Sequence, residues 1–584
     1  MNEFKLSHYI VTARSLDTKF ANSTKKIKIA LLGSFTLNGL ETTLRVKCAT
    51  NKIACQTYVA GYNQYHQETL DPESELYKFS PDISFLILDI RSILGNLFYS
   101  PYSVSASARR EFVQKQAKEI IDIAKGFLEK SKSKLVITNF VIPTYSPFGI
   151  FETKAEYSLQ DMVKDLNSLM VEESRKTPSL YVYDFNGFVT RYGENNIFDF
   201  RQFHYGDIKV ALDYIPYLAE DLMGYVKPAT GRNRKCIVLD LDNTLWGGIV
   251  GEDGFDGIKL GPKSPGSAYI EFQRHLLSLH RRGIILAINS KNNPDDALKV
   301  IREHPYMVLH EENFACVKIN WNDKISNMRQ IAAELNIGLD SMVFFDDDPV
   351  SRELMSKMLP EVVTVELPTD PSLYAPTIMR MNDFNVLNIT TEDMKRGEMY
   401  LQQRKTAELQ SRTSNLEEFL SQLGTRIKIK KVDSFTIPRV SQLILKTNQF
   451  NLTTHRYQEE DIRRLSRDDR ALIGCAHVED KFGDNGITGA FIVFKDPAVW
   501  TVDTFLLSCR VMGRGVEDAM MSYILSEAKK EGIKTVRAQY LPTSKNKPCE
   551  PFLEKYGFVR DGDYWTFMPT GTIKHPQYLE LIAE

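Results

Sequence analysis

The sequence predicts a multidomain α/β protein. Its 584 residues exceed what one hydrophobic core usually organises, so three or four domains are expected. A composition of 43% hydrophobic and 25% charged residues is that of an ordinary folded protein. Short apolar segments alternate with amphipathic ones over much of the chain, which is typical of βαβ units and parallel sheets.

Charge and cysteine content exclude several classes of protein. The formal net charge of −2 and the pI near 6.6 give no general attraction to nucleic acid or an anionic membrane, so neither is an expected partner. The seven cysteines include no CxxC pair, which indicates reduced thiols. No segment approaches the ~20 apolar residues that span a bilayer, and the N-terminus does not resemble a signal peptide. We therefore expect a cytoplasmic protein.

Four regions follow from the pattern of strands, helices and polar breaks. The first α/β domain is expected over residues 1–228, with strands at 26–33, 85–88, 134–138 and 180–185 and a helix at 111–130. A polar segment rich in turn-forming residues, KPATGRNRK at 227–235, leads into a second α/β domain over 229–388.

The remaining two regions are a connector and a third domain. Thr390 and Asp393 are spaced as a helix cap, so a helical connector is expected over 389–428, running to about Leu423. Strands at 472–480, 489–494 and 502–509 and a helix after Gly515 make residues 429–584 a further globular unit.

The strongest chemical signal is the segment from Ile237 to Thr244, where an apolar strand leads into Asp240-Leu-Asp242-Asn-Thr244. Two carboxylates at a buried strand end repel each other unless a cation lies beside them. Magnesium suits such hard oxygen ligands and a phosphate substrate. Further polar residues follow other strands, where ligands of parallel sheets bind: Ser290, Lys324, Asp346 and Asp347.

In this order, these residues resemble the four motifs of the haloacid-dehalogenase (HAD) superfamily, across about residues 232–385. The resemblance implies a Rossmann-like fold in which Asp240 attacks phosphorus and Asp242 is the general acid and base. It implies further that Thr244, Ser290 and Lys324 contact the phosphoryl group. The expected ligands of Mg²⁺ are the carboxylates of Asp240, Asp242, Asp346 and Asp347.

Four longer motifs resemble the FkbH-like proteins, over at least residues 232–560. They are VLDLDNTLWGGIVGEDG at 238–254, KTNQFNLTTHRY at 446–457, DKFGDNGITG at 480–489 and SCRVMGRGVE at 508–517. The resemblance implies capture of a glyceryl group from D-1,3-bisphosphoglycerate as an enzyme thioester, removal of the remaining phosphate, and transfer to an acyl carrier protein. Such glyceryl units serve polyketide and related biosynthesis. The carrier is expected to be a separate protein.

The last domain resembles GNAT acyltransferases. Arg510, Gly513 and Gly515 match the R-x-x-G-x-G turn that binds the coenzyme A pyrophosphate in that fold, and NKPCEPFLEKYGF at 546–558 resembles its final helix and strand. Cys509, before this turn, is the candidate acyl-bearing thiol, because a helix N-terminus and neighbouring arginines would lower its pKa. Cys475 is the second candidate.

Two residues of the KTNQFNLTTHRY motif are candidates for the transfer step. His455 is expected to act as a base, and Asn448 to position the acyl group.

The first domain resembles SGNH hydrolases in Ser34, Asn139, Asp199 and His204. The spacing of Asp199 and His204 and the residues around Ser34 depart from that pattern, so we expect a docking or scaffolding role rather than a working triad.

Other functions remain open. One is a stand-alone phosphatase acting on a small phosphate ester. Another is an acyl-coenzyme A-dependent acyltransferase or a catalytically silent assembly module in polysaccharide synthesis.

Overall fold

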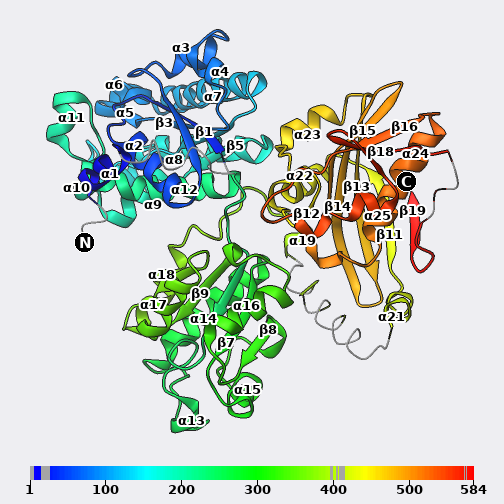
Figure 1. Ribbon diagram of the computed structural model, residues 1–584. Coiled ribbons are helices and arrows are strands. Elements are labelled where there is room, and N and C mark those ends of the chain that lie inside the picture. The colour runs from blue at the N-terminus through cyan, green and yellow to red at the C-terminus, as the bar shows by residue number, and fades with distance from the viewer. Residues whose placement is uncertain are drawn as a thin grey trace. The chain divides into compact units, whose positions relative to one another are not determined.

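The computed structural model describes residues 5–14, 26–394, 399–400, 402, 406, 415–570, 573 and 575–583. The chain forms two compact units, Met1–Thr230 and Gly231–Glu584 (Figure 1). Within the described ranges, no helix combines the length and apolar character that crossing a membrane requires.

The first unit is built on a parallel five-stranded sheet in the order β2-β1-β3-β4-β5. Its strands are β1 Lys26–Gly33, β2 Ala54–Val59, β3 Ile83–Ile87, β4 Lys134–Thr138 and β5 Leu180–Tyr183. Its longer helices are α1 Leu6–Arg14, α2 Leu40–Thr50, α7 Ala106–Lys130, α8 Leu159–Lys176, α9 Phe185–Tyr192, α11 Phe200–Gly206 and α12 Ile215–Ala229.

Helices cover both faces of this sheet. Neighbouring residues of a strand point to opposite sides, so each strand supplies side chains to both faces. In β3, Leu86 belongs to the core shared with α7 and α8, whereas the ring of Phe85 contacts Tyr225 of α12. All five residues of β3 are therefore buried, as expected for a central strand of a doubly covered sheet.

Two details of this unit differ from the sequence prediction. Strand β2 was not predicted, because its residues are mostly half-exposed and lack a continuous apolar run. The predicted linker begins inside a helix: Lys227, Pro228 and Ala229 form the last turn of α12.

The second unit contains a parallel sheet in the order β10-β9-β6-β7-β8. Its strands are β6 Cys236–Leu239, β7 Ile285–Ser290, β8 Phe314–Ile319, β9 Met342–Asp346 and β10 Val363–Glu366. Its main helices are α13 Val250–Asp253, α14 Gly266–Arg281, α15 Pro294–Glu303, α16 Lys324–Glu334, α17 Pro349–Met358 and α18 Tyr374–Met379.

Strand β6 lies at the centre of this sheet and contributes to a core on each face. Ile237 and Leu239 pack with α14, whereas Cys236 and Val238 pack with α16. All four residues are fully buried, so the position at which β6 ends is fixed by packing on both sides.

A second sheet of this unit is mixed, in the order β17-β18-β16-β15-β14-β13-β11-β19, with β12 paired to β15. Its strands are β11 Arg426–Lys431, β12 Phe450–Asn451, β13 Ala471–Asp480, β14 Gly483–Lys495, β15 Val499–Leu507, β16 Thr535–Ala538, β17 Val559–Asp561, β18 Tyr564–Phe567 and β19 Glu580–Ala583. Its helices are α22 Ile437–Lys446, α23 Glu459–Leu465, α24 Val516–Lys530 and α25 Phe552–Tyr556.

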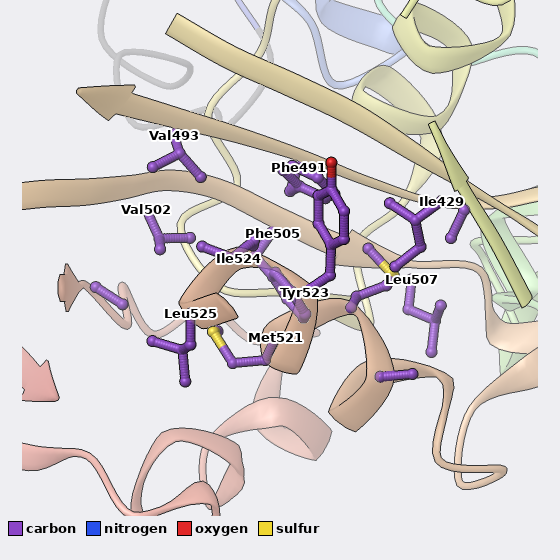
Figure 2. Close-up of a cluster of buried hydrophobic side chains, with 14 of the residues drawn as sticks. Ile429, Phe491, Val493, Val502, Phe505, Leu507, Met521, Tyr523, Ile524 and Leu525 are labelled. Carbon is purple, nitrogen blue, oxygen red and sulfur yellow. The ribbon is translucent and has the colours of Figure 1, made fainter. Parts of the chain in front are cut away.

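Helix α24 is anchored on one face of the mixed sheet. Met521, Ile524 and Leu525 pack in one core with strand residues that include Phe491 and Phe505 (Figure 2). Helix α22 contributes instead to a separate core that contains Cys475 and Leu506.

The predicted connector lies largely outside the described residues. Its start is confirmed, because the Thr390 hydroxyl accepts from the Asp393 amide and the Asp393 carboxylate accepts from the Thr390 amide. Helix α19 Thr391–Met394 follows, and α21 Leu416–Leu423 precedes β11.

Candidate active site

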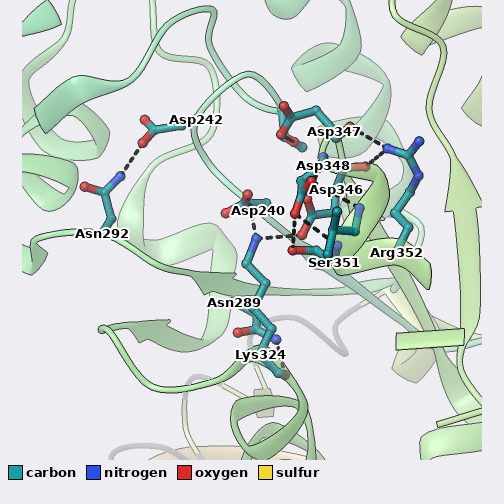
Figure 3. A network of polar contacts seen from close by, with 12 residues as sticks. Asp240, Asp242, Asn289, Asn292, Lys324, Asp346, Asp347, Asp348, Ser351 and Arg352 are labelled. Atoms are coloured by element: carbon teal, nitrogen blue, oxygen red, sulfur yellow. Dashed lines mark hydrogen bonds and ion pairs between the residues drawn. The ribbon is translucent and has the colours of Figure 1, made fainter. Parts of the chain in front are cut away.

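The four HAD-type motifs meet at the carboxyl edge of the parallel sheet in the second unit. Asp240 follows β6, Ser290 ends β7 and Asp346 ends β9, and these three strands are neighbours. Lys324 is the first residue of α16, so its side chain starts from the same edge. The sheet order therefore brings together residues that lie far apart in the sequence (Figure 3).

Lys324 joins two of the aspartates. Its Nζ lies 2.8 Å from Oδ2 of Asp240 and 2.6 Å from Oδ2 of Asp346. Burial opposes its charge, but the two carboxylates raise the pKa of Lys324 above its ordinary value. The side chain is thus held as an ammonium ion. The backbone carbonyl of Lys324 accepts a hydrogen bond from Nδ2 of Asn289 at 2.9 Å.

The carboxylates at this edge fit a divalent cation. Asp240, Asp346 and Asp347 each offer an oxygen, and these atoms lie within 4.8 Å of one another. Oδ1 of Asp240 is buried and has no hydrogen-bond partner among the described residues. Burial, together with the charge of Asp240, raises the pKa of Asp346 to about 7 even beside Lys324. The ammonium group of Lys324 neutralises only part of the negative charge of these carboxylates, and a hard cation such as Mg²⁺ would balance the rest.

The carboxylate of Asp242 is not part of this group of three and has other partners. Its Oδ1 accepts from Nε1 of Trp246 at 2.8 Å and from the Val250 amide at 3.1 Å, and its Oδ2 accepts from Nδ2 of Asn292 at 2.8 Å. Burial, reinforced by Asp240, raises the pKa of Asp242 despite these bonds. A carboxyl group with a raised pKa suits a general acid and base.

The remaining predicted contacts lie around the same carboxylates. Thr244 is fully buried, and its hydroxyl lies 3.4 Å from Oδ1 of Asp347. Ser290 is also buried, with its backbone carbonyl accepting from the Asn320 amide at 3.1 Å.

Three supporting residues were missed by the sequence analysis. Trp246 and Asn292 hold Asp242, and Arg352 donates to the backbone carbonyls of Asp346 and Asp347 at 2.8 and 2.6 Å. Trp246 stands inside a quoted motif, so its position was visible although its role was not. Asn292 and Arg352 carried no sequence signal of their contacts.

Cys509 differs from its prediction in two respects. It begins a short 3-10 turn, Cys509–Val511, and α24 begins only at Val516, so the thiol is not at the helix N-terminus. Burial raises the pKa of Cys509, although the positive charges of Lys235 and Arg510 act in the opposite direction. The predicted lowering of its pKa is therefore wrong, because desolvation dominates. Its backbone carbonyl accepts from Nδ2 of Asn336 at 2.9 Å.

The glycine-rich turn after Cys509 leads directly into α24. Gly513 and Gly515 have φ values of 73° and 79°, and Gly515 precedes α24 as its N-cap. Arg514 pairs with Asp480 at 3.0 Å in a buried contact, and the Nε of Arg510 lies 3.3 Å from the Ser508 hydroxyl.

His455 forms a pair with an acid that the sequence did not indicate. Its Nδ1 lies 3.1 Å from Oδ1 of Asp503, whose Oδ2 accepts from the Tyr457 hydroxyl at 2.8 Å. Asn448 instead accepts from Arg456 at 2.6 Å. No described hydrogen bond joins His455 or Asn448 to Cys509.

Ser34 and its proposed partners lie in separate contacts in the first unit. The Ser34 hydroxyl accepts from the Asp89 amide at 2.8 Å, and Asn139 donates to Asp184 at 2.7 Å. Asp199 caps α11, and His204 is an exposed residue of that helix. Among the described contacts, none joins Ser34 to Asp199 or His204.

Comparisons with known proteins found a family model and solved structures that match this chain. The family model described as FkbH, N-terminal domain, matches residues 28–227. A solved structure of the N-terminal part of the protein BF1531 from Bacteroides fragilis, containing a phosphatase domain complexed with Mg, is 30% identical with a TM-score of 0.60, and the match covers 66% of this chain and 100% of that chain. No curated protein matches this sequence.

Two further solved structures give lower TM-scores. The ribosomal-protein-S18-alanine N-acetyltransferase from Escherichia coli is 11% identical with a TM-score of 0.21, covering 25% of this chain and 96% of its own. Ard1 from Thermoplasma volcanium is 18% identical with a TM-score of 0.19, covering 24% and 94%.

Proposed function

We propose that this chain, which belongs to the FkbH family and is an enzyme of the HAD phosphatase type, is a magnesium-dependent phosphatase that also transfers a glyceryl group. In the full proposal, the enzyme captures a glyceryl group from D-1,3-bisphosphoglycerate as a thioester and removes the remaining phosphate. It then passes the glyceryl group to an acyl carrier protein.

The observation that carries the phosphatase step is the placement of Lys324 between Asp240 and Asp346, with Asp347 in the same cluster. An oxygen of Asp240 attacks phosphorus and forms an aspartyl phosphate while the phosphorus–oxygen ester bond breaks. Asp242 gives its proton to the departing oxygen. Asp242 then takes a proton from water, which attacks the aspartyl phosphate and releases inorganic phosphate.

The other residues of the site position and neutralise charge. Lys324 would offer an ammonium group to the phosphoryl oxygens, and Ser290 and Thr244 would donate hydroxyl hydrogen bonds to them. Asp240, Asp346 and Asp347 would hold Mg²⁺, which is also the ion named with the phosphatase domain of BF1531. When bound, Mg²⁺ supplies compensation for the charge of the phosphoryl group.

For the capture step we propose Cys509 as the thiol. Its sulfur attacks the carbonyl carbon of the acyl phosphate, a carbon–sulfur bond forms, and phosphate leaves with the carbon–oxygen bond broken. His455 would accept the thiol proton, and a later thiol exchange would move the acyl group to the pantetheine arm of the carrier. Cys509 is half-buried, whereas Cys475 is completely buried, which favours Cys509 of the two candidates.

A stand-alone phosphatase is the second candidate function. It is favoured by the raised pKa of Cys509, because a protonated thiol is a poor nucleophile. In that case the Asp240 site acts on a small phosphate ester without a thioester intermediate.

The test of the phosphatase step is Asp240→Asn. Phosphate release from p-nitrophenyl phosphate should fall by more than about tenfold while the circular dichroism spectrum stays unchanged, since the nucleophile is lost but the shape is kept. Excess chelator should stop the wild-type enzyme. Activity that persists in either case would contradict the assignment. Intact-protein mass spectrometry after incubation with 1,3-bisphosphoglycerate separates the two candidate functions, because only the first forms a glyceryl adduct, whereas a phosphatase alone forms at most an aspartyl phosphate.

A further inference from the structure

Asp346 and Asp347 are consecutive residues, yet both offer a carboxylate oxygen to the cluster that contains Asp240. Successive side chains of a strand point to opposite faces of its sheet, so two neighbours cannot both face Asp240 while the backbone stays extended. Strand β9 ends at Asp346, and the chain turns there before α17 begins at Pro349. The convergence of the two carboxylates therefore depends on the turn formed by residues 346–348.

Arg352 holds this turn through its backbone (Figure 3). The Nη1 atom of Arg352 lies 2.8 Å from the carbonyl oxygen of Asp346 and 2.6 Å from that of Asp347. One nitrogen can bond both oxygens only when the two carbonyl groups converge on it, so these bonds fix the peptide unit between the two aspartates. Arg352 is the fourth residue of α17, and Asp348 is the N-cap of that helix.

Asp348 restrains the same turn from its other end. Its amide donates to Oδ1 of Asp346 at 2.9 Å, and its carboxylate accepts from the first amides of α17. One carboxylate oxygen of Asp346 is thus held directly. The carboxylate of Asp347 is contacted by the Thr244 hydroxyl at the longer distance of 3.4 Å, so its placement depends more on the backbone that Arg352 holds.

The charge of Arg352 is not spent on neutralising the aspartates. Its guanidinium bonds backbone carbonyls, and among the described residues it forms no ion pair with a carboxylate. A positive charge this close to the cluster would by itself weaken the binding of a cation. The charge of Arg352 and its hydrogen bonds therefore act on Mg²⁺ affinity in opposite directions, which makes the sign of a mutational effect informative.

We propose that Arg352 is a positioning residue for the magnesium site. By holding the carbonyl groups of Asp346 and Asp347, it directs both carboxylates toward Asp240, where they would hold Mg²⁺. This inference rests on the phosphatase function proposed above, and it assigns Arg352 no contact with the metal or the substrate. Replacing residues that orient metal ligands from behind typically changes metal affinity about tenfold to a hundredfold.

Isothermal titration of the metal-free full-length protein with MgCl₂ tests the proposal without relying on activity. Arg352→Met keeps the apolar stem but loses the donors, so it should lower the affinity for Mg²⁺ by about tenfold or more although it also removes a positive charge. Arg352→Lys should lose less, because its ammonium group can still donate to the carbonyls. Thermal melting of each variant reports whether the fold is kept.

The matched control is Arg282→Met. Arg282 is also half-buried and donates to a backbone carbonyl, that of Phe384, at 2.8 Å. It follows α14 and precedes β7, so it lies at the opposite edge of the same sheet. Its replacement should leave the affinity for Mg²⁺ within about twofold of wild type, because no metal ligand depends on it.

Kinetics with p-nitrophenyl phosphate separate positioning from a general structural role. Arg352→Met should need more Mg²⁺ to reach half of its maximal rate, whereas kcat at saturating Mg²⁺ should stay within about threefold of wild type. This split is expected because bound Mg²⁺ would itself draw the two carboxylates together once its concentration is high enough.

Three results would overturn the proposal while leaving the magnesium site in place. The first is a folded Arg352→Met variant that binds Mg²⁺ as tightly as wild type or more tightly, since the charge of Arg352 would then matter more than its hydrogen bonds. The second is an equal loss of affinity in Arg352→Met and Arg282→Met, and the third is a loss of kcat that saturating Mg²⁺ does not restore. Wild-type protein that binds no Mg²⁺ would overturn the magnesium site itself and this inference with it.

Discussion

Nε1 of Trp246 donates a 2.8 Å hydrogen bond to Oδ1 of Asp242, so a fully buried indole orients the proposed general acid. Trp246→Phe removes this donor and keeps an aromatic ring. We expect kcat for phosphate release to fall about tenfold with KM nearly unchanged, because Asp242 loses orientation while substrate contacts stay. Steady-state kinetics with p-nitrophenyl phosphate measure both constants.

The matched control is Trp500→Phe, which alters a buried tryptophan of the mixed sheet far from Asp242 in sequence and in another core. Both variants should lose comparable stability, but only Trp246→Phe should lose activity. An unchanged kcat in folded Trp246→Phe would show that Asp242 does not depend on the indole.

Lys324 is the ammonium ion that separates Asp240 and Asp346, and replacing it leaves the carboxylates facing one another. Lys324→Met should destabilise the metal-free protein, since breaking a buried ion pair costs ~3–5 kcal/mol. Added Mg²⁺ should then raise the melting temperature more in Lys324→Met than in wild type. Differential scanning calorimetry with and without Mg²⁺ makes this comparison.

Lys357→Met serves as control for that experiment, because Lys357 is exposed and pairs with Glu353 on the surface of α17. Its response to Mg²⁺ should equal that of wild type. If Lys324→Met responds no more strongly than Lys357→Met, then Lys324 does not balance the charge of a cation site.

The sequence was sufficient to predict the polar site residues that stand at the carboxyl ends of strands. Asp240, Ser290 and Asp346 all follow buried apolar segments, and parallel strands must end at one edge. Arg352 could not be predicted in this way, because it binds backbone carbonyls rather than side chains. Contacts made through the backbone leave no pattern of residue types.

The predictions that were wrong depended on local rules that tertiary packing overrides. Pro228 indicated a linker, yet it lies in the last turn of α12, a helix whose residues are mostly buried. The two arginines near Cys509 indicated an acidic thiol, but the burial of that thiol has the larger effect on its pKa. Asp503, the partner of His455, is distant in sequence and lies on β15.

The hydrogen bond from His455 to Asp503, aided by the charge of Asp503, raises the pKa of His455 above its ordinary value although burial opposes this. Asp503→Asn should therefore lower the pKa of His455 toward or below about 6.5. Titration of the His455 Cε1 proton by NMR measures the change. Asp484→Asn, which alters an acid beside His477 instead, should leave the pKa of His455 unchanged.

The same pair makes stability depend on pH. The pKa of His455 is raised in the folded state, so the contribution of protonated His455 to the free energy of unfolding is fully present below its unfolded-state pKa of about 6.5. This contribution is lost as the pH rises through the folded-state pKa. Burial opposes the ionisation of Asp503, but its hydrogen bonds, of which the one with His455 has the largest effect, lower the pKa of Asp503. The contribution of ionised Asp503 to the free energy of unfolding is therefore lost as the pH falls through this lowered pKa. Urea unfolding from pH 4 to 8.5 should show a wild-type advantage over Asp503→Asn that declines toward the alkaline end. An advantage that grows with rising pH would have the wrong sign.

Cys509→Ser tests the proposed thioester directly. Wild-type protein incubated with 1,3-bisphosphoglycerate should gain a hydroxylamine-labile glyceryl adduct, and Cys509→Ser should gain none, because a serine hydroxyl stays protonated and far less nucleophilic. Phosphate release from p-nitrophenyl phosphate should be unaffected, since the Asp240 site is intact. Cys55→Ser, which replaces the other half-buried cysteine, should keep the adduct.

The pH dependence of adduct formation follows from the environment of Cys509. Burial raises the pKa of this thiol above its ordinary value, so only a small fraction is thiolate at neutral pH, and that fraction rises about tenfold for each pH unit below the pKa. The initial rate of adduct formation should therefore increase from pH 7 to pH 8.5 without a plateau, as measured by quenched intact-protein mass spectrometry. A rate that is already flat at pH 7 would mean that the thiolate forms in a conformation other than the one described. An adduct on Cys509→Ser at wild-type yield would place the acyl group on another cysteine, and no adduct on any variant would leave the plain phosphatase as the function of this chain.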